Sequence, residues 1–564
     1  MRIVDEAALL LRMGRWALAS ARHDTGVATR VPGNPKFATA REAVARIPDG
    51  AVVAVSGLGG NQRAAILHRA LRERFEAARR PRDLTLINVG GHGGRGFVAG
   101  TLEELARPGL VTRLFTSHFE TLPAFLKLAA AGRCELQCLP LGVIAALYDA
   151  RARGEASVLS EVGAGTFLDP REGRGTHVRG GRREQWVATE GDRLRYRLPP
   201  IDVAVFNLPA ADRRGNLYAD RAAMVGDSRE IALAARRHGG KVLANVGLLV
   251  EEDPARVFLP ADLVDAIVCH PDTEQTTGFL HRDPWALVTA EGAGDVAEGM
   301  AHARLVRRLA ELVGAFPRRR AADGVLARLA AATLVAELER GAHVAIGTGQ
   351  PEDVVAALVE SGRADEFTFL IESGMVGGVP APGAYFGAAF GPKRIVSTAE
   401  LFARCRERLD AACLGALEID AVGDVNVSQR GRGVRGTIGP GGFLDFTSAA
   451  RTIVFVSRWM RGGEIAVEDG AVRIVRRGRP KLVRRVAERC FDAARALRAG
   501  QRVLYVTPVG VLRATERGLA LASVMPGIDV QRDVLGMAPF PIALPESGAV
   551  PLLDRSGTFL RYER

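Results

Sequence analysis

The chain has 564 residues, of which 47% are hydrophobic and 25% charged, as is ordinary for a globular protein of two to four domains or two large lobes. Its 76 basic and 64 acidic residues give a formal net charge of +12. The basic residues are scattered and only 6% of residues are aromatic, so the composition argues against a nucleic-acid partner, which favours basic stripes with stacking rings. No apolar stretch approaches the length of a membrane span, so we expect no membrane partner.

The types of basic residue and the number of cysteines also indicate which ligands and which compartment to expect. Lysine occurs five times and arginine 71 times, a bias that indicates a GC-rich genome. A basic surface of this kind also suits a small molecule that carries phosphates. Cys134 and Cys138 have three residues between them, but no second pair or histidine cluster completes a metal site. We therefore expect reduced thiols, no metal, and a cytoplasmic protein.

The first 35 residues are predicted to be an N-terminal extension. Residues 5–22 have the spacing of an amphipathic helix. Acidic residues at its start and Arg12 and Arg15 within it interrupt the apolar run, unlike a signal peptide. An appended surface helix and a start codon placed too early are both consistent with this pattern.

An N-terminal lobe is predicted over residues 36–318, and it contains elements that recur later in the chain. Residues 51–72 read as a strand, a glycine turn and a helix. Residues 84–94 read as a second strand that ends in glycines, and residues 201–217 as a strand followed by a polar turn.

A C-terminal lobe is predicted over residues 324–545, followed by a tail at 546–564. Its segments 343–359, 367–378 and 417–427 repeat the three N-terminal segments in the same order. Two copies of one unit predict an α/β protein of two similar open α/β lobes, with the active-site cleft between them.

Glu372 is the strongest candidate for chemistry. It directly follows the apolar run 367–371 and precedes a glycine-rich turn. Ligands of open α/β sheets gather where strands end, and glycines there let backbone N–H groups approach a ligand. The counterpart of Glu372 in the first copy is Val89, so the acid is present in only one copy. A carboxylate that the fold needed would recur in both, and the asymmetry therefore favours a nucleophile or base.

Several motifs in a fixed order resemble the family I CoA-transferases. The chain is most similar to their single-chain propionate or acetate CoA-transferase group, which includes acyl-CoA:3-ketoacid transferases, over about residues 40–545. The motifs are Glu372–Pro380, Leu139–Ile144, Gly163–Pro170, Ala211–Asn216, Gly347–Pro351, Gly423–Ser428 and Gly439–Phe443. Each is weak alone, and their joint order carries the resemblance.

The resemblance implies a ping-pong transfer of CoA between short-chain carboxylic acids through a glutamyl-CoA thioester on Glu372. It implies CoA as a substrate, no tightly bound cofactor, and a homodimer or homotetramer. Backbone amides of three glycine pairs are the candidates for oxyanion or CoA contacts. These pairs are Gly59 and Gly60, Gly377 and Gly378, and Gly441 and Gly442.

The sequence departs from the family pattern at three places that bear on substrate choice. Members usually carry proline where Arg63 stands, a glycine-rich run where residues 404–410 stand, and Gln-Val-Glu near residues 244–247. Two alternatives remain open at this point. One is an acyl-CoA hydrolase that uses the same glutamate, and the other is a non-catalytic CoA-binding protein of this fold.

Overall fold

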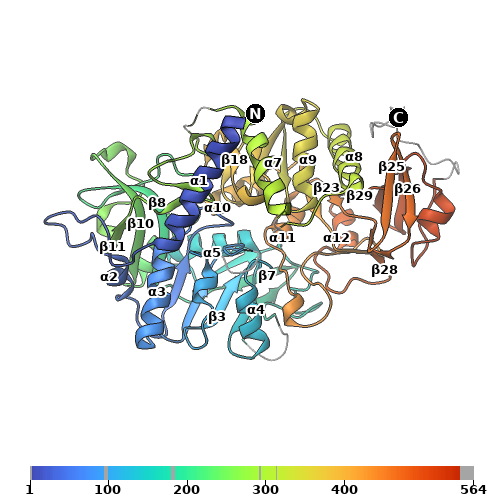
Figure 1. Cartoon of the computed structure of the whole chain (residues 1–564). Coiled ribbons are helices and arrows are strands. Elements are labelled where there is room, and N and C mark those ends of the chain that lie inside the picture. The colour runs from blue at the N-terminus through green and yellow to red at the C-terminus, as the bar shows by residue number, and fades with distance from the viewer. Residues whose placement is uncertain are drawn as a thin grey trace.

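Two large sheets, one in each half of the sequence, organise the chain, and helices pack against both (Figure 1). The computed structural model describes residues 3–94, 99–178, 184–290, 292, 294–312, 314 and 316–545. The predicted α/β arrangement of two similar lobes is confirmed. The predicted tail, residues 546–564, lies outside the described residues.

The first sheet is parallel along its main path, with β1 at its centre. Its strands are continuous apolar runs, because a parallel sheet with helices on its faces is buried on both sides. In spatial order they are β11 (Ala266–Cys269), β10 (Lys241–Val250), β8 (Val203–Asp212), β1 (Val52–Val55), β2 (Leu84–Ile87), β3 (Val111–Thr116) and β4 (Glu135–Cys138), with β9 (Leu217–Tyr218) antiparallel to β8. The helices of this half are α2 (Ala40–Val44), α3 (Ala65–Ala78), α4 (Pro123–Ala130), α5 (Leu141–Arg153) and α6 (Ser228–Arg237).

The second sheet has a parallel centre and antiparallel edges. In spatial order its strands are β19 (Arg394–Ile395), β16 (Met375–Val376), β15 (Phe367–Ile371), β14 (Ala342–Ile346), β20 (Ala411–Gly415), β23 (Thr452–Val456), β29 (Arg502–Thr507), β30 (Gly510–Thr515) and β31 (Gly518–Val524). The helices of this half are α7 (Val296–Leu312), α8 (Ala321–Glu337), α9 (Gln350–Glu360), α10 (Thr398–Glu407), α11 (Phe443–Ala449) and α12 (Ala493–Arg498).

Short sheets decorate both lobes. They are formed by β5 (Ser157–Ser160), β6 (Val187–Glu190) and β7 (Arg193–Arg197); β12 (Glu274–Thr276) and β13 (Phe279–Leu280); β17 (Val379–Pro380) and β18 (Ala389–Phe390); β21 (Glu418–Asp420), β22 (Val425–Asn426) and β28 (Leu482–Val483); β24 (Met460–Arg461) and β27 (Arg479–Pro480); and β25 (Glu464–Glu468) and β26 (Ala471–Arg476).

The internal repeat is visible in the strand order of the two sheets. β1, β2 and β8 of the first sheet correspond to β14, β15 and β20 of the second, and all these neighbours pair in parallel. The polar turns also match, because Asp212 and Asp420 each accept a backbone hydrogen bond from the glycine three residues later. The predicted match of 201–204 with 417–420 is wrong in its strand, since β20 holds the position of β8 and residues 418–420 form β21.

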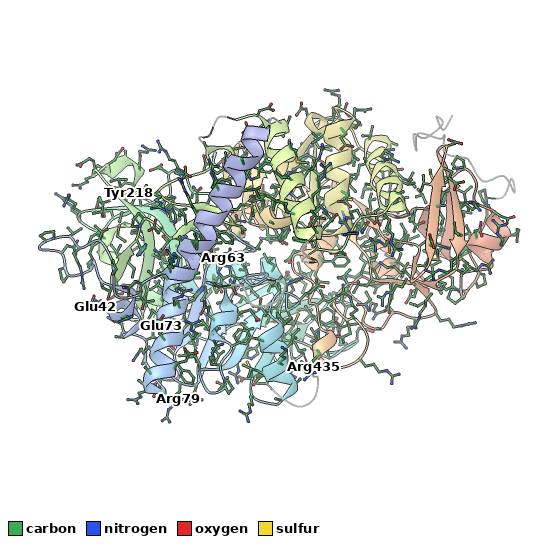
Figure 2. The ribbon with its side chains drawn as sticks, viewed as in Figure 1. Glu42, Arg63, Glu73, Arg79, Tyr218 and Arg435 are labelled. Atoms are coloured by element: carbon green, nitrogen blue, oxygen red, sulfur yellow. The ribbon has the colours of Figure 1, made fainter. Side chains whose placement is uncertain are left out.

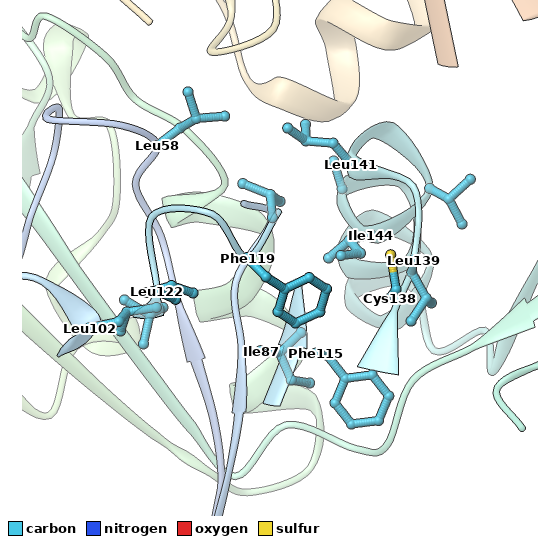
Figure 3. Packing of buried hydrophobic residues seen from close by; sticks show 14 of the residues in the cluster. Leu58, Ile87, Leu102, Phe115, Phe119, Leu122, Cys138, Leu139, Leu141 and Ile144 are labelled. Atoms are coloured by element: carbon cyan, nitrogen blue, oxygen red, sulfur yellow. The ribbon is translucent and has the colours of Figure 1, made fainter. Parts of the chain in front are cut away.

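The two lobes share a hydrophobic core. One buried cluster includes Phe115 and Phe119 of the first lobe together with Phe402 and Phe446 of the second. Figure 3 shows Phe115 and Phe119 beneath the loops that carry Leu58 and Leu141. Helix α5 contacts both α10 and α11 across the boundary between the lobes. The lobes are therefore held in a fixed relation by packed side chains.

The helix predicted over residues 5–22 is present as α1 (Ile3–Arg22). It runs along the outside of the molecule between α3 and α7 (Figure 1). It contacts β13, and Met13 packs against a hydrophobic cluster that contains residues of the second sheet.

Candidate active site

A cavity of about 1380 Å³ lies between the two lobes. Both sheets turn the carboxyl ends of their parallel strands towards it, which is where ligands of open α/β sheets bind. Its walls include Leu58, Gly90, His118 and Leu141 from the first lobe, and Gly347, Glu372, Ala416, Arg458 and Pro508 from the second.

Glu372 follows the last residue of β15 and lines this cavity. The turn around it is rigidly held. The Gly374 N–H donates to the Ile371 carbonyl at 2.9 Å, and the Ser373 hydroxyl donates to the Gly387 carbonyl. Gly374 has φ +104°, and a Cβ there would lie 2.0 Å from the Val396 carbonyl oxygen, so only glycine fits. The backbone of Glu372 is therefore held in one position at the carboxyl end of β15.

The Gly441–Gly442 turn faces Glu372 from the neighbouring segment. Gly442 is the N-cap residue of α11, and its backbone N–H lies close enough to the Glu372 carboxyl group to lower the pKa of that group. A Cβ on Gly442 would lie 2.6 Å from Glu372 Oε2. The first lobe holds the turn in place, because the Gly441 N–H donates to the Ser117 carbonyl at 3.0 Å.

Burial controls the charge of two neighbouring carboxyl groups. It raises the pKa of Glu372 to about 7, and the Gly442 N–H opposes this shift. Burial raises the pKa of Asp445 to about 7 as well, and the charge of Glu372 contributes to that rise. Asp445 Oδ2 accepts a hydrogen bond from the Gly142 N–H at 3.0 Å, whereas no donor among the described residues reaches its buried Oδ1. Glu372 is thus a carboxylate with the raised basicity of a catalytic group.

The structure brings four of the six predicted glycines to the cavity. Gly59, Gly60, Gly441 and Gly442 line it together with Glu372. Gly59 packs closely against the second lobe, because a Cβ on it would lie 2.8 Å from the Phe386 carbonyl oxygen.

Gly377 and Gly378 are not part of the cavity wall. The Gly377 N–H donates to the Phe369 carbonyl at 2.8 Å, so it is occupied within the sheet. A Cβ on Gly378 would lie 2.6 Å from the Phe390 carbonyl oxygen. Both residues have positive φ. Glycine is needed at these positions because they form the tight turn between β16 and β17.

Arg63, the first departure from the family pattern, lies in the cavity wall as an ion pair. Its Nε is 2.6 Å from Glu274 Oε1, and each side chain is 2% exposed. Glu274 also accepts a hydrogen bond from Trp16 Nε1 of α1 at 2.8 Å. The N-terminal helix therefore contributes a side chain to the cavity, which the sequence pattern did not predict.

The other two departures lie away from the cavity. Residues 404–410 complete α10 and lead into β20, and none of them is in the cavity wall. Residues 244–247 lie within β10, where a Cβ on Gly247 would lie 2.0 Å from His281 Cβ. Their effect on the cavity is therefore indirect.

A group of four cations, which we call the cationic end, lines the far part of the cavity: Arg430, Arg458, Arg461 and Lys481. Arg458 pairs with Asp323 and Arg430 with Glu120, whereas no carboxylate among the described residues pairs with the other two. Burial, followed by the neighbouring arginines, lowers the pKa of Lys481 to about 7. Excess positive charge along a partly exposed cavity wall favours an anionic ligand.

Strand spacing gives the separation between Glu372 and the cationic end. Glu372 follows β15 and Arg458 follows β23, with β14 and β20 between these strands. Three strand spacings amount to roughly 14 Å. The cavity is therefore long, with Glu372 towards one end and the cationic end at the other.

Sequence reasoning missed the cationic end, Trp16 and Asp445. Lys481 is one of only five lysines in the chain, and that rarity was the one available signal. Asp445 follows the Gly439–Phe443 motif by two residues, within the first turn of α11.

Neither a cluster of metal-binding side chains nor a membrane-spanning helix occurs in the part of the chain that the structure describes. Its residues contain no group of three or more histidine, cysteine or acidic side chains placed to hold a metal ion. None of the described helices is long and apolar enough to cross a membrane.

Known proteins with the same fold and related sequences carry CoA-transferase names. The family model described as coenzyme A transferase matches residues 37–270. Caffeate CoA-transferase of Acetobacterium woodii is 30% identical over 533 residues, which cover 90% of this chain and 95% of that protein. Acetate CoA-transferase YdiF of Escherichia coli K12 is 28% identical, with 92% and 94% covered.

Solved structures agree with the sequence relatives. The apoenzyme of the acyl-CoA transferase YdiF from E. coli O157:H7 superimposes with a TM-score of 0.81 at 26% identity, covering 95% of this chain and 99% of that one. A second structure of that protein, described as a thioester complex with CoA, gives a TM-score of 0.80 at 26% identity, with the same coverage. The chain therefore belongs to the family I CoA-transferases and is an enzyme that transfers CoA.

Proposed function

We propose that this enzyme moves CoA between two short-chain carboxylic acids through a glutamyl-CoA thioester on Glu372. The observation that carries the proposal is a partly buried carboxyl group in the cavity wall, beside the Gly442 turn, whose pKa desolvation raises to about 7. The thioester complex described for the E. coli acyl-CoA transferase supports the same kind of intermediate.

The reaction needs no net proton transfer. Glu372 attacks the acyl-CoA carbonyl, the C–S bond breaks, and CoA leaves as a thiolate with an acyl-glutamyl anhydride behind it. The thiolate then attacks the glutamyl carbonyl, the first carboxylate leaves, and a glutamyl-CoA thioester forms. A second carboxylate repeats the two steps in reverse and departs as the new acyl-CoA, which regenerates Glu372.

The Gly442 amide fits the role of oxyanion donor. Negative charge develops on the carbonyl oxygens of each tetrahedral intermediate, beside Glu372. A preorganised N–H stabilises that charge at little reorganisation cost. Gly442 lies directly beside the Glu372 carboxyl group, within reach of the glutamyl carbonyl, and the bond from the Gly441 N–H to the first lobe holds the turn in place.

The cationic end suits the phosphate groups of CoA. The pantetheine arm would run along the ends of β14, β20 and β23, from Glu372 to Lys481. Binding energy gained there, remote from the carbonyl, can be used to position the thioester for attack by a weak nucleophile.

The thioester test begins with mass spectrometry of the peptide that contains Glu372. Wild-type enzyme incubated with acyl-CoA and then with hydroxylamine or borohydride is expected to carry the modification at this residue. Glu372→Gln removes the nucleophile and is expected to abolish both modification and transfer. Glu407→Gln, an exposed position, is the matched control.

An unmodified wild-type peptide during turnover would contradict the proposal. Omission of the acceptor carboxylate distinguishes transfer from hydrolysis by the same glutamate. We expect the thioester to persist without acceptor, whereas steady release of CoA under that condition would identify a hydrolase.

The rate of thioester formation is expected to depend on pH. Glu372 reacts as the carboxylate, and its pKa is raised to about 7 by burial. Below that value the reactive fraction falls tenfold for each pH unit. Because Asp445 titrates in the same range, the observed pKa values belong to the pair. A single-turnover rate that stayed flat down to pH 5.5, with folding verified by circular dichroism, would contradict this assignment.

Gly442→Ala keeps the backbone N–H but moves it relative to Glu372, and is expected to lower kcat by about 10²–10³-fold, as the loss of an oxyanion donor does. The added methyl group would lie 2.6 Å from Glu372 Oε2 and so displace the carboxylate or the turn. The φ of −81° is open to alanine, but the methyl group would also lie 3.2 Å from the Phe402 and Phe446 rings, so the melting temperature should fall modestly. Gly14→Ala adds a methyl group with no atom within 4 Å and serves as the control. Full activity of Gly442→Ala would rule out the donor role.

Lys481→Ala is expected to raise KM for acyl-CoA by roughly tenfold or more, the loss typical of a charge-assisted hydrogen bond, with kcat less affected. Lys127→Ala removes the same charge from an exposed site on α4 and should leave KM unchanged. A fall in kcat at unchanged KM would show instead that Lys481 acts in the chemical step and not in CoA binding.

A further inference from the structure

The proposed positions of the thioester and of the CoA phosphates leave one part of the cavity for the acyl group. The inference rests on that proposed function. With CoA along β14, β20 and β23, the remaining space near Glu372 adjoins the first lobe. We call this region the acyl end, and its walls are formed by Trp16, Leu58, Gly60, Arg63 and Thr277.

Contacts across the cavity bring the acyl end close to the nucleophile. The Ser373 hydroxyl, next to Glu372, donates to the Gly387 carbonyl. The adjacent Phe386 carbonyl oxygen would be 2.8 Å from a Cβ on Gly59. A Cβ on Gly60 would be only 1.7 Å from Thr277 Oγ1, so the loop at 58–60 is pressed between the two walls.

Trp16 is fixed at this end by a chain of polar contacts. Its Nε1–H donates to Glu274 Oε2 at 2.8 Å, and Glu274 is paired with Arg63. Arg63 Nη2 in turn donates to Thr277 Oγ1 at 3.4 Å. Figure 2 shows Arg63 beside α1. Because the ion pair is almost fully buried, loss of one partner would leave the other charge uncompensated.

Helix α1 is anchored on both sides of Trp16. Towards its start, Arg12 pairs with Asp283 at 3.5 Å and lies 5.0 Å from the centre of the Phe279 ring. At its end, Arg69 donates to the carbonyls of Ser20 at 2.8 Å and Ala21 at 3.1 Å. The indole is therefore presented to the cavity from a helix that has little freedom to move away.

We infer that Trp16 is a specificity-determining residue, and that α1 uses its indole to limit the length of the acyl group that fits between Glu372 and the first lobe. The Arg63–Glu274 ion pair acts as the support that holds the indole in place. The N-terminal helix is then part of the substrate site.

The experiment measures kcat/KM for a series of straight-chain acyl-CoA donors from acetyl to octanoyl with one acceptor. Each extra methylene is worth roughly tenfold or more in discrimination when a wall excludes it. We therefore expect Trp16→Ala to raise the octanoyl-to-acetyl ratio of kcat/KM by at least about tenfold. Leu11→Ala, on the exposed side of the same helix, is the matched control.

Two further variants guard against a loss of helix docking. Trp16→Phe keeps most of the ring and should shift the ratio less than Trp16→Ala. Deletion of residues 1–22 removes the wall altogether and should shift it at least as far. An unchanged ratio in both Trp16→Ala and the deletion would overturn the inference.

The outcome is separable from that of the proposed function. Wild-type enzyme that forms no adduct at Glu372 defeats the proposed function. An adduct at Glu372 together with an unaltered chain-length ratio in the variants defeats only the role of Trp16.

Discussion

The site depends on how the Gly441–Gly442 turn is joined to the opposite lobe. The Gly441 N–H donates to the Ser117 carbonyl, the Leu141 N–H donates to the Gly441 carbonyl, and the Gly142 N–H donates to Asp445. A surface turn of this kind would ordinarily be mobile, but here both of its sides are bonded across the boundary between the lobes. The position of Gly442 beside Glu372 is therefore a property of the interface, and the proposed nucleophile and donor are aligned only when the lobes are packed together.

Local sequence patterns were sufficient to predict the central strands of both sheets and the position of Glu372 at a strand end. The apolar runs before residues 57 and 372 became β1 and β15 because continuous hydrophobic segments are what a parallel sheet buries. Glu372 and Val89 also differ in their surroundings, because Glu372 lines the cavity whereas Val89 is fully buried. Glycine pairs were less informative. Gly377 and Gly378 have the same sequence signature as Gly441 and Gly442, yet contacts with distant carbonyl groups, not composition, decide which pair reaches the cavity.

The parts of the site that pattern did not predict come from segments far apart in the chain. Trp16, Arg63 and Glu274 meet although more than 200 residues separate the first two from the third. Lys481 reaches the cavity beside β23 from the bend between the short strands β27 and β28. Contacts between residues so far apart in the sequence depend on how the two lobes assemble. No periodic pattern in a single sequence predicts them.

In the proposed cycle, the neighbouring carboxyl groups of Glu372 and Asp445 would keep the charge of the site similar in both half-reactions. The charge on Glu372 helps to keep a proton on Asp445, whose pKa is raised to about 7. A glutamyl thioester is neutral, so in the proposed cycle that repulsion disappears once CoA is attached. Asp445 then releases its proton more readily. The interior would thus hold a similar total charge in both half-reactions, and the solvation cost of a buried anion would be shared between two residues and not removed and restored at every turnover.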